Sequence, residues 1–146
     1  MDEKDRKILE ALKENSRLST QKIAKRTEMP ITTVYHRMKR MEKLGIIKGY
    51  TTVLDYKKIG KPITAYVLIT VDYKLLKALK MSQHELAQKI KTYDLVEETS
   101  IVTGGTDIII KIRVRDIDQM SDFVTKQLRN VDGVENTQTL VVLSEV

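Results

Sequence analysis

Six side chains between residues 32 and 43 carry the groups with which a protein reads and holds nucleic acid. At 3.6 residues per turn, they share one side of a helix. A helix in the major groove of DNA presents its first residues to base edges, while later cations neutralise phosphates. We therefore predict base contacts with double-stranded DNA from the first three members of this set and phosphate contacts from the last three: Thr32, Thr33, His36, Lys39, Arg40 and Lys43.

The positive charge of the chain is concentrated in the same region. Residues 1–50 contain 13 Lys and Arg against 7 Asp and Glu, and residues 51–146 contain 13 of each, so the whole net charge of +6 lies in the first third. Glu42 is the only acidic residue between Pro30 and Lys48. A lone helix of this kind is more often an ordinary solvated amphipathic helix, but the charge asymmetry favours a segment that meets a polyanion.

Three short helices are expected to position this face. Asp2 is a candidate N-cap of the first helix, with Asp5 in the first turn, where a carboxylate is favourable. Ser19 is the candidate N-cap of the second helix, and Pro30 is expected in the first turn of the third, which stops at Gly45. One stripe of the third helix is apolar and is expected to be buried: Val34, Met38 and Met41. Residues 1–50 therefore read as a three-helix, winged helix-turn-helix domain.

The remaining residues predict a linker and a second domain. Tyr50–Leu54 is a short strand candidate, followed by a polar turn at residues 55–60. We accordingly expect a linker strand and hinge over residues 51–61 and a second domain over residues 62–146.

The second domain shows the order strand, helix, strand, strand, helix, strand. Alternating apolar residues mark the strands, and the sequences Ser82–Glu85 and Asp116–Gln119 are typical of helix starts. This order predicts an α+β fold, a ferredoxin-like βαββαβ sandwich with helices on one face of the sheet. The uncovered face must pack against something, and a homodimer is the commonest arrangement. The expected strands cover residues 62–71, 96–103, 107–115 and 134–143.

A set of short motifs runs in a fixed order along nearly the whole chain. Its members are residues 5–12, Arg17-Leu18-Ser19, Ile23-Ala24, Val34, Arg37-Met38, Met41-Glu42, Gly45-Ile46-Ile47, Gly49-Tyr50, Gly60, residues 103–107 and the last strand. Taken together, these motifs resemble the Lrp/AsnC (feast/famine) family of transcriptional regulators. The resemblance implies a dimer, often assembled into tetramers or octamers, that binds pseudo-palindromic promoter DNA and senses amino acids or related metabolites at subunit interfaces.

By position, the resemblance also implies an effector site. A glycine turn lets a ligand approach the backbone, and the Asp107 carboxylate is suited to an α-amino group. The alternative is that the glycines only turn a hairpin and that Asp107 only caps it. The implied effector-binding residues are Gly104, Gly105 and Asp107 in the hairpin and Thr137, Gln138 and Thr139 on the facing strand.

Four features depart from the family pattern. Glu28 stands where a glycine is common, Pro30 where a serine cap is common, and Thr106 where a larger residue is usual. Residues 73–81 lengthen the connection before the first covering helix, and they either extend that helix or protrude from it.

Two other functions are compatible with parts of this sequence. A siroheme-decarboxylase-like enzyme resembles the same two-domain organisation, but the only histidines are His36, on the proposed DNA face, and His84, inside a helix cap, so we expect no catalytic activity, metal or cofactor. A weakly specific architectural DNA-binding protein would favour Lys and Arg over Thr32 and Thr33. The charged N-terminus, the absence of cysteine and the lack of a long apolar run lead us to expect a cytoplasmic, nucleoid-associated protein without a membrane partner.

Overall fold

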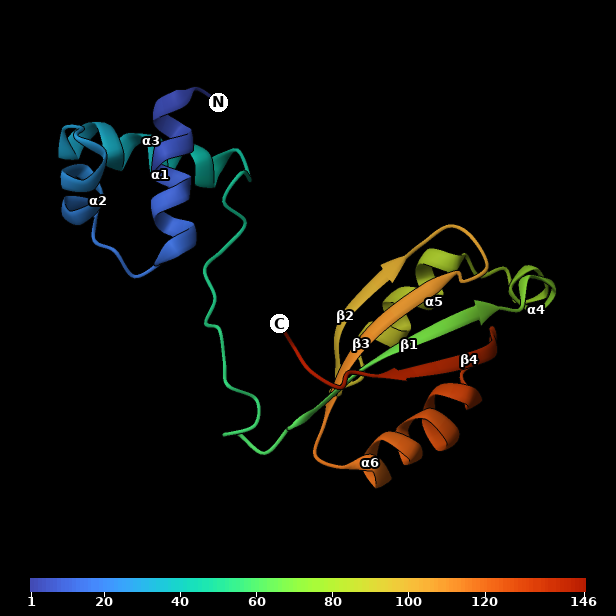
Figure 1. The fold of residues 1–146 in the computed structure, drawn as a ribbon. Coiled ribbons are helices and arrows are strands. Elements are labelled where there is room, and N and C mark those ends of the chain that lie inside the picture. The colour runs from blue at the N-terminus through green and yellow to red at the C-terminus, as the bar shows by residue number, and fades with distance from the viewer. The chain divides into compact units, whose positions relative to one another are not determined.

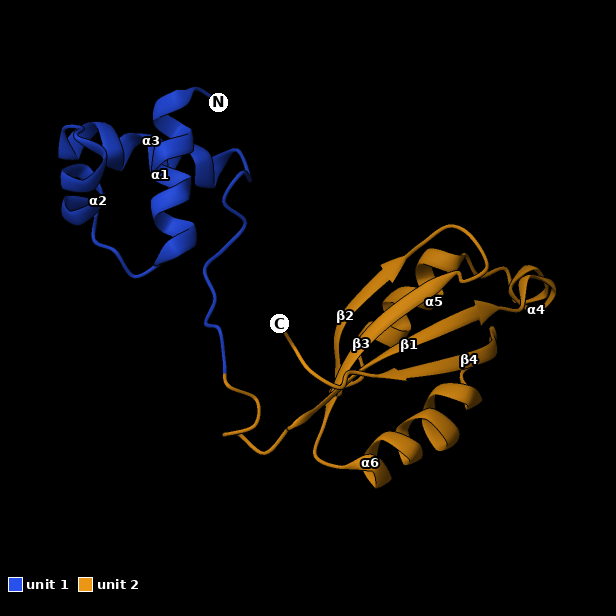
Figure 2. Cartoon of the chain, in the orientation of Figure 1, with its two compact units in different colours: residues 1–54 blue, residues 55–146 orange.

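The computed structural model describes all 146 residues, which fold into two compact units (Figures 1 and 2). Unit 1 comprises Met1–Leu54 and contains only helices, and unit 2 comprises Asp55–Val146 and contains the sheet. Each unit has its own apolar core.

Unit 1 consists of α1 (Glu3–Glu14), α2 (Thr20–Thr27) and α3 (Ile31–Lys43). The predicted caps are present: Asp2 and Asp5 form a reciprocal capping box, and Ser19 Oγ accepts a hydrogen bond from the backbone N–H of Lys22. The three helices bury one another's apolar faces, and four side chains of this core are completely inaccessible to solvent: Ile8, Ile23, Val34 and Met41.

The turn between α2 and α3 differs from expectation in one detail. Pro30 was expected within the first turn of α3, but it is the N-cap residue itself, with an extended ψ of 142°. Proline has no side-chain acceptor for the first N–H groups, so α3 begins without a side-chain cap. Glu28 ends α2 in the left-handed conformation at φ 55°, which costs a non-glycine residue about 1 kcal/mol.

The predicted strand at residues 50–54 was wrong, because the structure has no regular secondary structure there. A strand needs a neighbouring extended segment to pair its N–H and C=O groups, and unit 1 contains none. Val53 is fully exposed, and unit 1 is therefore a helix-turn-helix without a β-hairpin wing in the single chain. The turn expected at residues 55–60 is present, with Gly60 at φ 79°.

Unit 2 is an antiparallel sheet in the order β2-β3-β1-β4. Its strands are somewhat shorter than predicted at their ends. In chain order the elements are β1 (Ile63–Val71), α4 (Tyr73–Ala78), α5 (Gln83–Lys91), β2 (Val96–Ile101), β3 (Ile108–Val114), α6 (Ile117–Asp122), a π-helical turn (Phe123–Gln127), a short 3-10 helix (Leu128–Asn130) and β4 (Val134–Val141).

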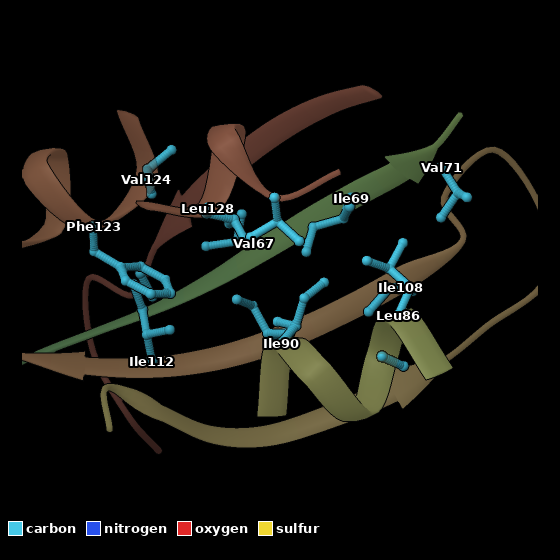
Figure 3. Close-up of a cluster of buried hydrophobic side chains, with 14 of the residues drawn as sticks. Val67, Ile69, Val71, Leu86, Ile90, Ile108, Ile112, Phe123, Val124 and Leu128 are labelled. Atoms are coloured by element: carbon cyan, nitrogen blue, oxygen red, sulfur yellow. The ribbon is translucent and has the colours of Figure 1, made fainter. Parts of the chain in front are cut away.

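The helices cover one face of this sheet. Alternate residues of β1 and β3, such as Val67 and Ile112, are buried in one cluster with Leu86 and Ile90 of α5 and with Phe123 beyond α6 (Figure 3). Residues of the opposite face are only partly covered, and the largest apolar ones are Tyr66, Leu68, Ile109 and Leu140. The predicted ferredoxin-like sandwich with one open face is confirmed.

The long connection at residues 73–81 forms a helix of its own, α4, and does not extend α5. Asp72 Oδ1 caps α4 at the Leu75 N–H, and Lys80 leaves it at φ 53°. Leu76 fixes the helix by packing against Gly133, where a Cβ atom would lie 2.6 Å from Leu76 Cδ2. Gly133 also has a φ of 100°, so both space and backbone conformation require glycine at this position.

We predict that Gly133→Ala lowers the free energy of unfolding by about 1–3 kcal/mol, because the added methyl group displaces Leu76 and strains the backbone. Chemical denaturation of the full chain measures this change. Gly105→Ala is the matched control, because a Cβ there meets nothing within 4 Å and φ is unstrained. Equal stabilities of the two variants would contradict the packing role of Gly133.

Candidate nucleic-acid interface and ligand-binding region

The structure places the predicted DNA-binding residues on the side of α3 that faces away from the core. Val34 and Met41 are buried, whereas five of the six predicted residues are exposed and Thr33 is half-buried. The same side carries Tyr35, which the sequence analysis did not single out. Its ring is half-exposed, packs edge-to-face on His36 at 5.4 Å and lies 5.9 Å from Lys39 Nζ. The sequence could have indicated Tyr35, because it is a large aromatic residue within an otherwise polar helix face.

The three cations of this face are not equivalent. Lys43 makes no ion pair, Lys39 Nζ lies 3.2 Å from Glu42, and Arg40 Nη2 donates to Asp5 Oδ2 at 2.7 Å. An exposed pair such as Lys39–Glu42 is weak and leaves the lysine free to exchange partners. The Arg40 pair involves a carboxylate with no solvent exposure, so Arg40 has a structural role besides any contact with phosphate.

Asp5 connects α1 to α3. Its carboxylate is completely buried and accepts hydrogen bonds from Arg37 Nη1 at 3.0 Å, from Arg40 Nη2 at 2.7 Å and from the Asp2 N–H at 2.9 Å. The Arg37 guanidinium also lies 2.8 Å from the Asp2 carboxylate. Two residues one turn apart on α3 are thus fixed to the start of α1, which sets the orientation of the exposed face.

The ionisation of both carboxyl groups follows from these contacts. The Arg37 guanidinium and the Asp5 N–H lower the pKa of Asp2 to about 2. Burial alone would raise the pKa of Asp5, but hydrogen bonds from Asp2 and Arg37 and the charge of Arg40 outweigh it and lower that pKa. Both groups are therefore anionic near neutral pH, and they offset the charges of Arg37 and Arg40.

In unit 2, Asp107 connects the hairpin between β2 and β3 to the elements beside it. Its Oδ2 accepts from the Val71 N–H and its Oδ1 from the Tyr73 hydroxyl, both at 2.8 Å, and its backbone oxygen accepts from Gln83 Nε2 at 3.1 Å. The bond to Asp107 raises the pKa of Tyr73. These contacts fix the loop between β2 and β3 to the end of β1, as the structural alternative for Asp107 requires. The turn itself needs glycine at Gly104, where φ is 111°.

The three β4 residues of the predicted effector site do not form one wall within the chain. Thr137 and Thr139 pair with Ile69 and Val67 and share their helix-covered face, whereas Gln138 lies on the open face. Thr137 Oγ1 also accepts a hydrogen bond from Arg129 Nε at 3.1 Å. Because β1 separates β4 from β3, the β4 residues stand about 10 Å from the hairpin strand.

Comparison with known families identifies both units. Residues 1–48 match the winged helix-turn-helix DNA-binding family, and residues 64–146 match the Lrp/AsnC ligand binding domain. The chain belongs to the Lrp/AsnC family. It is an HTH-type transcriptional regulator, with a DNA-binding helical domain followed by a ligand-binding α+β domain.

Individual relatives match along almost their whole length. An HTH-type transcriptional regulator of Pyrococcus furiosus is 38% identical over 146 residues, which is 100% of this chain and 93% of the relative. The structure of a transcriptional regulator of Neisseria meningitidis in complex with L-Met has a TM-score of 0.90 at 26% identity, covering 100% of this chain and 92% of that one. E. coli AsnC has a TM-score of 0.84 at 28% identity, covering 99% and 93%. In this Lrp/AsnC member no helix is long and apolar enough to cross a membrane.

We predict that Asp5→Asn lowers the free energy of unfolding by about 1–3 kcal/mol at neutral pH, because two guanidinium groups lose their buried anionic partner. Glu3→Gln, in the same helix turn but exposed and without an ion pair, should have little effect. Because the folded state lowers the pKa values of Asp2 and Asp5, the wild type should lose stability as pH falls from about 4 toward 2. Asp5→Asn should lose less over that range. Urea denaturation at several pH values measures both effects, and identical pH profiles would refute the network.

Proposed function

We propose that the protein binds pseudo-palindromic promoter DNA sequence-specifically through α3. The observation that carries this proposal is the exposed, acid-poor side of α3, oriented by Asp5 within a domain of the winged helix-turn-helix type. Residues at the start of a recognition helix reach base edges, and residues further along meet the backbone. Thr32, Thr33 and His36 are therefore assigned to bases, and Lys39, Arg40 and Lys43 to phosphates.

The ligand-binding domain is proposed to sense a free amino acid or a related metabolite. The Neisseria meningitidis regulator that shares the fold was solved with L-Met, which supports this class of effector. Gly104, Gly105, Asp107, Thr137, Gln138 and Thr139 remain the proposed contact residues. Since Gln138 lies on the open face and the threonines on the other, one chain does not bring all of them into one pocket, and we propose that different subunits contribute them.

A homodimer through the open face of the sheet is also proposed, with further assembly to tetramers or octamers. Tyr66, Leu140 and the partly covered Leu68 and Ile109 place apolar surface on this face, as expected where sheets pack together. Such a dimer presents two recognition helices to half-sites about 34–36 Å apart.

We further propose that residues 1–50 act as the DNA-binding part, residues 51–61 as linker and residues 62–146 as sensor, in a cytoplasmic, nucleoid-associated regulator without catalytic activity. The relatives from Pyrococcus furiosus and Neisseria meningitidis are transcriptional regulators. His36 and His84, the only histidines, lie in different units, and both are exposed, which does not favour the alternative of a tetrapyrrole enzyme.

Substitutions on α3 should separate two classes of DNA contact. Lys43→Ala should weaken binding to all sequences alike and reduce the salt slope by about one unit, because one phosphate contact is lost. His36→Ala should relax the base preference and leave the slope unchanged. Arg40→Ala should resemble Lys43→Ala but also destabilise unit 1 through Asp5.

Selection of bound sites from random DNA, followed by titrations at several salt concentrations, measures both properties. Addition of the common amino acids to the same titrations tests the effector. Identical base preferences and salt slopes for His36→Ala and Lys43→Ala would refute the assigned roles.

For the dimer, Leu140→Asp in the full chain should shift the sedimentation coefficient toward that of a monomer, because it places an unpaired charge in the packed face. Leu79→Asp is the matched control, since Leu79 is equally exposed (46% against 45%) but follows α4, away from the sheet face. A wild-type chain that sediments as a monomer at micromolar concentration would exclude the dimer.

A further inference from the structure

A cavity of about 650 Å³ lies in unit 2 on the helix-covered side of the sheet, at the end where β1 begins and β3 ends. Its lining comes from the turn after α5, from the residue that follows β3 and from α6 with the π-helical turn. The volume lies within the range of about 300–1,000 Å³ that is usual for small-molecule sites. The hairpin with Gly104 and Asp107 precedes β3 and is therefore at the opposite end of that strand.

The floor of the cavity is apolar and is backed by the core. Tyr93 and Phe123 pack edge-to-face with ring centroids 5.6 Å apart, and Leu95 completes the apolar surface. Phe123 belongs to the buried core, where it lies beside Ile112 at the end remote from Val71 (Figure 3). Phe123 thus supports Tyr93 from the core side, and the accessible apolar surface of the floor is that of Tyr93 and Leu95.

The rim carries two unpaired charges of opposite sign. Arg115 is held by Asp116 at 3.0 Å, and Asp122 is held by Lys126 at 2.8 Å. Lys61 and Asp94 also line the cavity, but neither forms an ion pair or a side-chain hydrogen bond. A cation and an anion that both lack partners match a small ligand that itself carries a carboxylate and an ammonium group.

The backbone next to the cavity is irregular in a way that is frequent at functional sites. Residues Phe123–Gln127 form a π-helical turn in which the Leu128 N–H donates to the Phe123 carbonyl oxygen. Fewer than about 1% of residues adopt this conformation, which is less stable than an α-helix and concentrates at functional sites. Both ends of the turn, Phe123 and Gln127, line the cavity.

The cavity also adjoins the start of unit 2. The Lys61 N–H donates to the Tyr56 carbonyl oxygen at 2.8 Å and so closes the turn at residues 55–60. The Tyr56 ring stacks on the Arg113 guanidinium at 3.7 Å, and its hydroxyl donates to Glu97 at 3.3 Å. A ligand bound to Lys61 thus contacts the residue that closes the turn by which unit 2 is joined to unit 1.

We propose that this cavity binds a free α-amino acid, with its carboxylate at Lys61, its ammonium group at Asp94 and its side chain over Tyr93 and Leu95. The proposal rests on the proposed function for the class of ligand, and it adds a site separate from the Gly104–Asp107 hairpin. Because Lys61 follows the connecting turn, occupancy of the cavity links the ligand to the DNA-binding unit.

The test is calorimetric titration of the full chain with each common amino acid, followed by variants of the rim. For the amino acid that binds, Asp94→Asn and Lys61→Met should each raise the Kd about tenfold or more, since each removes one charge-assisted contact. Asp118→Asn and Lys74→Met are the controls, because both residues are exposed and neither lines the cavity. Their Kd values should equal that of the wild type.

Two results would overturn the site: no binding by any amino acid, or binding that Asp94→Asn leaves intact while a Gly104 or Thr139 variant weakens it. Promoter titrations separate this proposal from the regulatory one. Binding that depends on Asp94 but leaves DNA affinity unchanged supports the site and refutes regulation through it. A change in DNA affinity that persists in Asp94→Asn, together with a calorimetric isotherm that this variant leaves unchanged, supports the regulator and refutes this cavity.

Discussion

The buried carboxylate of Asp5 is the contact on which the DNA-binding unit depends. It joins the first turn of α1 to two arginines, Arg37 and Arg40, that are one turn apart on α3. Apolar packing of Val34 and Met41 holds α3 against the core but does little to fix its rotation, because such contacts have no direction. Hydrogen bonds from two guanidinium groups to one buried acceptor do have direction, so they fix which residues of α3 face outward.

In the ligand-binding unit, too, a few specific contacts fix the position of the loops. Strand β1 is central, with β3 on one side and β4 on the other, and the loops at its end meet at Asp107 and Gly133. Asp107 fixes the hairpin to β1 and to Tyr73, while Gly133 leaves room for Leu76 of α4. The helix that lengthens this connection is thus part of a rigid junction beside the hairpin, and the proposed amino-acid contacts there form on a loop that is already anchored.

The two ends of the sheet differ in whether their charged side chains already have hydrogen-bond partners. At the hairpin end, the Asp107 carboxylate already accepts two hydrogen bonds, whereas at the opposite end the side chains of Lys61 and Asp94 make no hydrogen bond or ion pair. The charges of Lys61 and Asp94 beside the turn at residues 55–60 are therefore free to bind a ligand. In the proposal made above, sensing and DNA binding communicate through this short segment of backbone.

Much of this protein could be predicted from its sequence, because the information is local. The caps at Asp2, Ser19 and Ser82, the apolar stripe of α3 and the alternation along β1 each depend on residues a few positions apart, and the structure has them. The strand at residues 50–54 was wrong because a strand is a property of a pair, and the single chain offers no partner. The bonds from Asp5 to Arg40 and from Val71 to Asp107 span 35 and 36 residues, and the cavity at Lys61 and Asp94 gathers residues from four segments. Such contacts leave no periodic trace in the sequence, so only the tertiary structure decided them.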